Sequence, residues 1–384
     1  MFLAFALLVI AFATLWPMPG PSHQWAFCLA CGAHGTSDLL LNIALFMPLG
    51  AALALRGRRS SSIAAVAGLL SAAIELSQFY IPGRDPSLSD IVSNTLGAIL
   101  GALLVHSARF WLFPRTPDAS WLCRGAALGA ALICLSTGLL LTPSFPAWQY
   151  YGLWTPNFPE LAWYRGHVLN AAIGATPIRS APIPARDHVR DLLQSPAGYE
   201  LRVQALAGPP PQNLAPLFTI VDDWRREVVL VGVDRAEFVF RARLRAAAWR
   251  FDRPDVRVFQ PVRSGDTIFV RVTARNGHYS INGVERGFTV GNGWALLLYP
   301  EALPFKNVLS ALWIGALFIP AGFWLRTRID GVTVALGLLS GLLLVPALTP
   351  LLPTPLSHWV AAGLGLLGGA YLGRLTGAGP PRPA

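Results

Sequence analysis

The sequence predicts a multi-pass α-helical membrane protein of about eight spans with an inserted all-β sandwich domain. The chain of 384 residues is 53% hydrophobic and only 13% charged, which is too apolar for one soluble globule of ordinary composition. Several windows reach the roughly 18 to 20 apolar residues that cross a bilayer. Between residues 143 and 305 the pattern changes to short alternating runs that are typical of strands.

The eight expected spans can be placed by their apolar runs and by the helix breakers and charges between them. In chain order they are residues 1–16, 38–55, 61–80, 91–113, 121–142, 308–325, 332–352 and 356–375. The first could instead be a cleaved signal peptide, but no positively charged segment precedes its apolar run. We therefore expect a retained first span.

The formal net charge of +10 comes almost entirely from arginine, because Lys306 is the only lysine. With eight spans, the arginines at 56–59, 109–124, 326–328 and 374 all fall on one side. By the positive-inside rule that side is cytoplasmic. We expect an inner-membrane protein with both termini cytoplasmic and the β domain outside or periplasmic. The chain has no nucleic-acid-binding motif, so membrane lipids are its expected surroundings.

Acidic and amide side chains gather around the turn between the third and fourth expected spans. Glu75 lies about a turn and a half below the membrane surface. A charge there costs roughly 2.5 to 3.5 kcal/mol and is therefore usually paired or functional. Polar residues three or four apart share helix faces with it and with Asp90. The predicted polar site comprises Asp38, Asn42, Glu75, Gln78, Arg84, Asp90 and Asn94.

The order and spacing of these residues resemble the VanZ-like family of bacterial membrane proteins over residues 1–106. The resemblance rests on Asp38-x-x-x-Asn42-Ile-x-x-Phe46-x-Pro48-x-Gly50, Glu75-x-x-Gln78, Pro-Gly-Arg84, Ser87/Ser89-Asp90, Asn94-Thr-Leu-Gly97 and Gly101. Gly97 and Gly101 have the spacing that lets two membrane helices approach closely. The family is named for a protein linked to teicoplanin resistance, so the resemblance implies a role in the cell envelope and in antibiotic tolerance.

Three interpretations of the polar site remain open. The groups could bond to one another and fix helix packing. They could bind an envelope lipid, glycan or glycopeptide, such as a lipid-linked glycan precursor. Glu75 and Asp90 could also serve as an acid/base pair in an intramembrane enzyme. The sequence lacks a nucleophile motif, a metal-ligand spacing and a phosphate-binding glycine loop, so it favours binding over catalysis, with no metal and no cofactor.

The composition divides the chain into four parts. Residues 1–142 form a VanZ-like membrane domain of five helices with its core motif at 38–106, and residues 143–305 form the β-sandwich. Residues 306–376 supply three C-terminal helices, and the tail 377–384 is too rich in proline and glycine to fold.

Strands of the β domain are expected at 216–221, 227–233, 237–245, 267–274, 278–281 and 294–299. Asn276-Gly277 is the strongest hairpin signal, and Asn282-Gly283 predicts a second turn. With Phe238-Val-Phe240, this order of runs resembles laminin-G and concanavalin-like sandwiches over about 200–299. The resemblance implies glycan binding; an inert sandwich that packs on the membrane part is the alternative.

Two smaller groups of residues complete the predictions. Aromatic residues gather before the strands and are expected to anchor at the headgroup layer, with a sugar-stacking platform as the alternative; they are Trp148, Tyr150, Tyr151, Trp154, Trp163 and Tyr164. Cys28 and Cys31 could form a local disulfide or, less in keeping with their surroundings, a metal or redox site. Cys123 and Cys134 are expected as small core residues.

Overall fold

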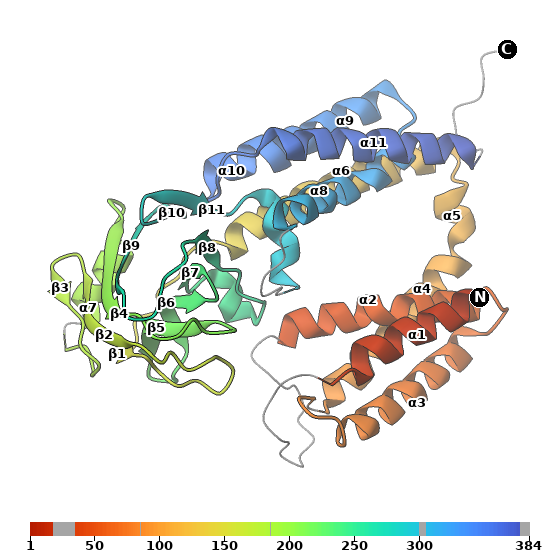
Figure 1. Cartoon of the computed structure of the whole chain (residues 1–384). Helices are drawn as coiled ribbons and strands as arrows, with labels where there is room; N and C mark the ends of the chain where they lie inside the picture. Colours follow the sequence, from red (N-terminus) through yellow and green to blue (C-terminus); the bar gives the residue numbers. More distant parts are fainter. Residues whose placement is uncertain (18–34, 85, 185, 299–304, 377–384) are drawn as a thin grey trace.

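The computed structural model describes residues 1–17, 35–84, 86–184, 186–298 and 305–376. It consists of two helical bundles and one β-rich body (Figure 1). Six helical segments are long and apolar enough to cross a membrane: 35–54, 60–78, 88–106, 116–140, 306–323 and 328–348. Each of the eight predicted spans contains a helix, although α1 (Phe2–Leu15) is shorter and α11 (Leu356–Leu375) is not among these six. The predicted fold class is therefore confirmed.

The N-terminal bundle contains α1, α2 (Gly35–Ala54), α3 (Ser60–Gln78) and α4 (Leu88–His106). Helices α2 and α4 approach so closely that a Cβ at Gly97 or Gly101 would collide with the carbonyl oxygens of Ile43 and Met47. A Cβ at Gly50 would likewise collide with the backbone of Ala98. Small residues permit this distance between membrane helices.

The C-terminal bundle contains α6 (Thr116–Leu140), α8 (Lys306–Phe323), α9 (Arg328–Leu339), α10 (Val345–Leu348) and α11. A π-helical turn, η3 (Ser340–Leu344), joins α9 to α10, and the short α5 (Ala108–Leu112) joins the two bundles. Although α6 follows the N-terminal helices in sequence, it packs with the C-terminal ones, where Cys123 and Ala127 share a buried cluster with Ala321 and Val334. Cys123 and Cys134 are both free and buried.

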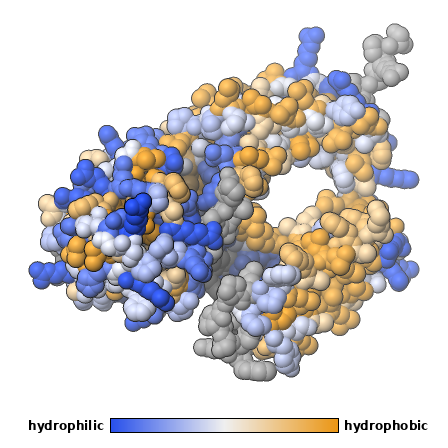
Figure 2. All heavy atoms as spheres, viewed as in Figure 1, coloured by the Kyte–Doolittle hydropathy of each residue, from blue (hydrophilic) through white to orange (hydrophobic). Residues whose placement is uncertain are grey.

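Large apolar side chains are exposed on the outer faces of both bundles. Among them are Phe5, Leu8, Leu69, Val92, Leu128, Leu312, Leu336 and Leu367. Figure 2 shows apolar residues over both bundles and polar residues over the β body and at the opposite ends of the helices. Exposed apolar surface of this extent is typical of protein that faces lipid.

The β body has two antiparallel sheets. The five-stranded sheet has the order β1 (Tyr150–Trp154), β5 (Ala215–Asp222), β6 (Glu227–Asp234), β7 (Glu237–Ala242) and β8 (Val256–Phe259). The six-stranded sheet has the order β11 (Val284–Gly287), β10 (His278–Ile281), β9 (Thr267–Arg275), β4 (Tyr199–Leu206), β2 (His167–Ile173) and β3 (Thr176–Pro177). Their inner faces share one core, in which Phe240 of β7 meets Tyr279 of β10 at a ring distance of 5.4 Å. A helix, α7 (Arg186–Leu193), precedes β4.

Both predicted turns are present in the six-stranded sheet. Asn276 and Gly277 join β9 to β10 with φ of 46° and 76°, and Asn282 and Gly283 join β10 to β11 with φ of 50° and 85°. Two successive positive φ values match the right-handed twist of a hairpin and favour Asn-Gly. The hairpin predictions are confirmed.

Two predictions about this body are wrong. Residues 294–299 do not begin a strand, because Val290–Leu296 form a 3-10 helix, η2, with a capping box between Thr289 and Asn292. Tyr150 and Tyr164 are not headgroup anchors, because they are 0% and 3% exposed and belong to the core. Cys28, Cys31 and the tail 377–384 lie outside the described residues.

The β body and the C-terminal bundle form one packed unit. Leu141, Ile314 and Leu342 belong to the same buried cluster as the sandwich core. The Leu352 amide, after α10, donates to the Phe288 carbonyl oxygen at 2.7 Å. The N-terminal bundle meets this unit at the start of α2: the Thr36 amide donates to the Arg250 carbonyl oxygen at 3.1 Å, and the Ser37 hydroxyl donates to that of Leu296 at 2.8 Å.

The N-terminus, α5 and the connection between α8 and α9 lie at the end of the molecule far from the β body (Figure 1). Arg326 and Arg328 belong to that connection. The side of the membrane on which this end lies remains a prediction from the positive-inside rule.

Candidate functional site

Glu75 lies at the end of α3 nearest the turn and is 1% exposed. Its carboxylate oxygen Oε2 accepts a hydrogen bond from the Ser87 amide at 2.8 Å. Ser87 is the N-cap residue of α4, and a carboxylate at a helix N-terminus is stabilised by the unpaired amides and the helix dipole. Glu75 therefore fixes the start of α4 against the end of α3.

Polar side chains connect α2, α3 and α4 at two levels, one helical turn apart. They are Asn42 with Asp90 at one level and Asn94 at the other. The Asn42 amide hydrogen-bonds to the Asp90 carboxylate, which also accepts from the Ser89 hydroxyl at 3.2 Å. The Asn94 Nδ2 donates to the Ser71 hydroxyl at 2.9 Å. Asn94 is only 2% exposed, and its Oδ1 has no hydrogen-bond partner among the described residues. A buried acceptor without a partner is uncommon in folded proteins.

Gln78 and Arg84 bind the end of α1. Gln78 donates to the Thr14 carbonyl oxygen at 3.0 Å. The Arg84 guanidinium donates to the carbonyl oxygens of Trp16 and Ala13 at 3.2 and 2.7 Å. Burial lowers the pKa of Arg84. Its charge thus caps the C-terminal end of α1, where a cation is favourable.

Six of the seven predicted residues thus lie in three separate local groups. Asp38, the seventh, is exposed in the first turn of α2 and also interacts with another residue. Asp85, an alternative ion-pair partner for Arg84, lies outside the described residues. Among the described residues, no group of three or more His, Cys, Asp or Glu could hold a metal ion.

Sequence reasoning missed one buried acid at the opposite end of the C-terminal bundle. Asp330 is 0% exposed and accepts from the Ser120 hydroxyl at 2.8 Å, from Arg124 at 3.2 Å and from the Thr327 amide at 2.9 Å. It ties α9 to α6. The signal was present, because Thr327-x-x-Asp330 has the spacing of a capping box.

A second candidate site is the outer face of the six-stranded sheet. Residues of β9 alternate strictly, so that Thr267, Phe269, Arg271, Thr273 and Arg275 point outward and are exposed. Phe269 is 64% exposed. An exposed aromatic ring among polar side chains is a common feature of binding surfaces.

Three hollows run along this sheet, and we call them together the sheet groove. The first, of about 1010 Å³, is lined by Asn170, Arg202, Gln204, Phe269, Arg271 and Asn282, among others. The second, of about 780 Å³, shares Thr273 and Ser280 with the first. The third, of about 280 Å³, shares Tyr199, Arg275 and Tyr279 with the second and reaches Thr142 and Pro350 at the ends of membrane helices.

The Tyr279 side chain is buried in the sandwich core beneath the end of the groove near the helices. Tyr279 is 2% exposed, and its hydroxyl has no hydrogen-bond partner among the described residues. Burial raises the pKa of Tyr279, and the hydroxyl is not exposed to the groove. Arg275 lies at the same end with its side chain exposed.

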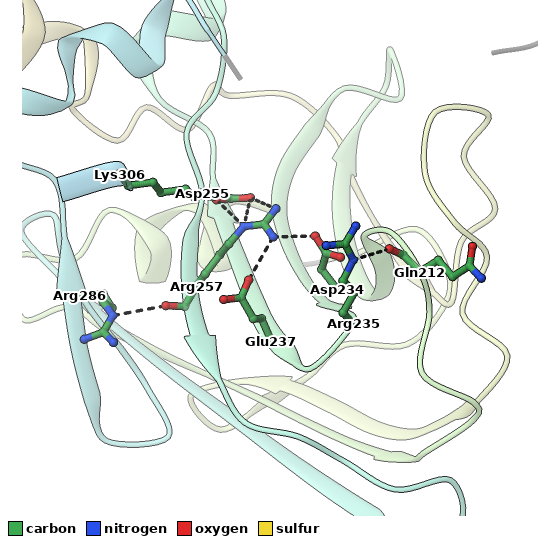
Figure 3. Close-up of polar contacts among 8 residues, drawn as sticks. All are labelled: Gln212, Asp234, Arg235, Glu237, Asp255, Arg257, Arg286 and Lys306. Carbon is green, nitrogen blue, oxygen red and sulfur yellow. Dashed lines mark hydrogen bonds and ion pairs between the residues drawn. The ribbon is translucent and has the colours of Figure 1, made fainter. Parts of the chain in front are cut away.

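Figure 3 shows a third polar cluster, centred on Arg257. Arg257 is paired with Asp234 at 2.6 Å, with Asp255 at 2.9 Å and with Glu237 at 3.2 Å, and Lys306 of α8 reaches Asp255 at 3.5 Å. Burial alone would raise the pKa of Asp255, but the hydrogen bonds and charge of Arg257 with the charges of Lys306 and Arg241 lower it. This cluster, the Arg257 network, joins α8 to the β body.

Comparison with known proteins identifies the N-terminal part. Residues 3–111 match the family model described as VanZ/LLP1. This part of the chain is a VanZ/LLP1 domain. The match begins within α1, ends within α5 and does not include α6. No curated protein and no solved structure matches the chain. The likeness of the β body to laminin-G and concanavalin-like sandwiches therefore remains a prediction from sequence.

Proposed function

We propose that this VanZ/LLP1 membrane protein binds a membrane-anchored glycan of the cell envelope in its sheet groove. The carrying observation is the continuity of the groove, which extends from Phe269 on the sheet to Pro350 between α10 and α11. A ligand in the groove would extend from the outer sheet face to the membrane helices. A sugar chain with a lipid anchor has this shape.

The lining suits carbohydrate chemistry. Asn170 and Gln204 offer amide donors and acceptors to sugar hydroxyls. The Phe269 ring offers an apolar face for stacking. Glu200 lies 3.3 Å from Arg202 and 3.7 Å from Arg271, and these pairs hold both guanidinium groups over the groove.

An intramembrane enzyme receives no added support. Glu75, its expected acid or base, is buried and bonded to the Ser87 amide. The proposal therefore assigns the protein a binding role, with envelope and antibiotic tolerance as its cellular consequence.

The first test uses Phe269→Ala with Phe259→Ala as the matched control, since Phe259 is 71% exposed but lies on the other sheet. Purified full-length protein in nanodiscs is titrated with soluble envelope oligosaccharides. We expect Phe269→Ala to weaken binding about fivefold, because an aromatic contact contributes about 1 kcal/mol, and the control to bind like wild type. Equal affinities for all three proteins, or no binding by wild type, would refute the proposal.

The cellular consequence is tested in a deletion strain complemented with wild type, Phe269→Ala or Phe259→Ala, with membrane levels checked by blot. We expect only Phe269→Ala to fail in restoring tolerance to envelope stress and glycopeptides. Full restoration of tolerance by both variants would show that the sheet groove has no role in tolerance.

A further inference from the structure

The two bundles contain a repeated helix pair. Helix α2 carries Ala44-Leu45-Phe46-Met47-Pro48-Leu49-Gly50, and α8 carries Ala316-Leu317-Phe318-Ile319-Pro320-Ala321-Gly322, which differs at two positions. Phe46 and Phe318 are both 0% exposed, and each segment has its proline inside the helix.

The partner helices repeat as well. Helix α4 carries Leu96-Gly97-x-x-x-Gly101-Ala102, and α11 carries Leu364-Gly365-x-x-x-Gly369-Ala370. The glycines at both positions are buried in both helices. We call α2 with α4 the first pair and α8 with α11 the second pair.

The close approaches within the two pairs correspond residue for residue. In the first pair, Cβ atoms at Gly97 and Gly101 would collide with the carbonyl oxygens of Ile43 and Met47. In the second, Cβ atoms at Gly365 and Gly369 would collide with those of Gly315 and Ile319, which occupy the aligned positions. Gly50 and Gly322 make the reciprocal contacts with the aligned residues Ala98 and Leu366.

This alignment shows which residues the shared packing does not require. Asn42 aligns with Ile314, and Asn94 with Ala362. Ile314 and Ala362 are both 0% exposed. The second pair therefore forms the same crossing with apolar residues where the first pair has amides. The crossing of the two helices therefore does not require the amides of the first pair, although Asn94 also binds Ser71 of α3.

The end of the second pair that lies next to the β body contacts another segment of the chain. Gly291 of η2 fits there between Ser310 and His358, the residues that align with Asp38 and Asp90. The Trp294 indole donates to the Ser310 hydroxyl at 3.0 Å. This end of the second pair thus binds a segment of its own chain.

We propose that the corresponding end of the first pair is a ligand site for an ammonium group, such as the amine of a lipid headgroup or of an amino sugar. The groups of this site accept hydrogen bonds: the Asp90 carboxylate and the buried Asn94 Oδ1, which has no partner among the described residues. Arg84 donates to the carbonyl oxygens of α1 and not to these acceptors. An ammonium group supplies the N–H donors that they lack. This site and ligand are distinct from the sheet groove.

The test replaces residues of the first pair by those aligned in the second: Asn94→Ala and Asp90→His. The matched control is Asn307→Ala, an exposed asparagine at the start of α8. The probes are dodecylammonium and dodecyltrimethylammonium, which carry the same charge but differ in N–H donors. Binding to the purified full-length protein is measured by microscale thermophoresis, and folding by thermal unfolding.

We expect wild type and Asn307→Ala to bind dodecylammonium about tenfold more tightly than dodecyltrimethylammonium, and each swapped variant to lose that preference. The unfolding temperatures of the swapped variants should stay near that of wild type, because the second pair packs with the same residues. Equal binding of both probes by wild type, or unchanged binding by the swapped variants, would overturn the site. Unfolding of Asn94→Ala would overturn the argument from the aligned pairs.

Discussion

The two membrane bundles contain the same helix pair in different surroundings. In the N-terminal bundle, the pair belongs to a small core of its own, with Ile10, Phe46, Ile63 and Ala98 among its members. In the C-terminal bundle, the corresponding pair shares its core with the β sandwich. The same crossing geometry thus occurs in a bundle with a core of its own and in a bundle that shares its core with the β body. The VanZ/LLP1 match is confined to the first.

The largest expected effect is a loss of stability in the C-terminal bundle and the β body, with the N-terminal bundle unchanged. Arg257→Met leaves Asp234, Asp255 and Glu237 without their guanidinium partner. Removing one partner of a buried charge cluster costs about 3 to 5 kcal/mol. Hydrogen exchange should accelerate in β8 and α8 but not in α2 and α4.

The control for that experiment is Arg263→Met, which removes an exposed arginine of the same body. It should leave exchange unchanged everywhere. Equal acceleration in α2 and α4 of Arg257→Met would show that the two bundles unfold together.

A somewhat smaller effect would test whether the helix pairs are equivalent. Gly97→Ala and Gly365→Ala each force a methyl group against a backbone carbonyl oxygen of the partner helix. We expect each to lower the free energy of unfolding by about 3 kcal/mol, the upper range for overpacking. Gly363→Ala is the control in α11, because nothing lies within 4 Å of its Cβ position. A marked difference between the two test variants would contradict the equivalence.

The sequence predicts the parts of this molecule that depend on local physics. Hydropathy locates a helix in each of the eight expected spans, and Asn276-Gly277 locates a hairpin because few other residues tolerate its φ values. The polar end of the VanZ/LLP1 domain is also visible in sequence, since an acid such as Glu75 is conspicuous within an apolar span.

The remainder depends on contacts between distant segments. The sequence predicts a strand for the apolar run at Trp294, yet Trp294 lies in η2, where its indole donates to Ser310 of α8 and Asn292 caps the helix. Nothing local in Tyr150 distinguishes a core residue from a headgroup anchor. The common core of Leu342 with the sandwich is likewise invisible, because each segment alone reads as an ordinary span or strand.

The stability of the β body should depend on pH in a way that the stability of the N-terminal bundle does not. The pKa of Asp255 is lowered in the folded protein, so its contribution to stability is complete above the ordinary value of about 3.9 and is lost as the pH falls through the lower folded value. We expect the β body to lose stability below about pH 4. Thermal unfolding of wild type and Asp255→Asn across this range measures the effect, and a parallel decline in both proteins would assign it to other acids.

The smallest expected effect concerns the VanZ/LLP1 domain alone. Arg84→Gln removes two charge-assisted hydrogen bonds at the end of α1. We expect a loss of about 1 to 2 kcal/mol, because the carbonyls lie near the turn where water replaces part of the interaction. Faster hydrogen exchange confined to α1 would agree with this role. Exchange that spreads to α8 and α11 would mean that the bundles are more tightly coupled than their separate cores suggest.

The placement of the β body between α6 and α8 also has a consequence for biogenesis. These two helices pack in one bundle, but more than a hundred and sixty residues separate Leu140 from Lys306. Contacts between segments this far apart form late, because closing the intervening loop costs entropy before any contact compensates for it. During synthesis, α6 must therefore wait in the bilayer without its partners, whereas α1 to α4 can assemble as soon as they are inserted. The C-terminal half is the part whose maturation should respond most to slowed folding or to a missing chaperone.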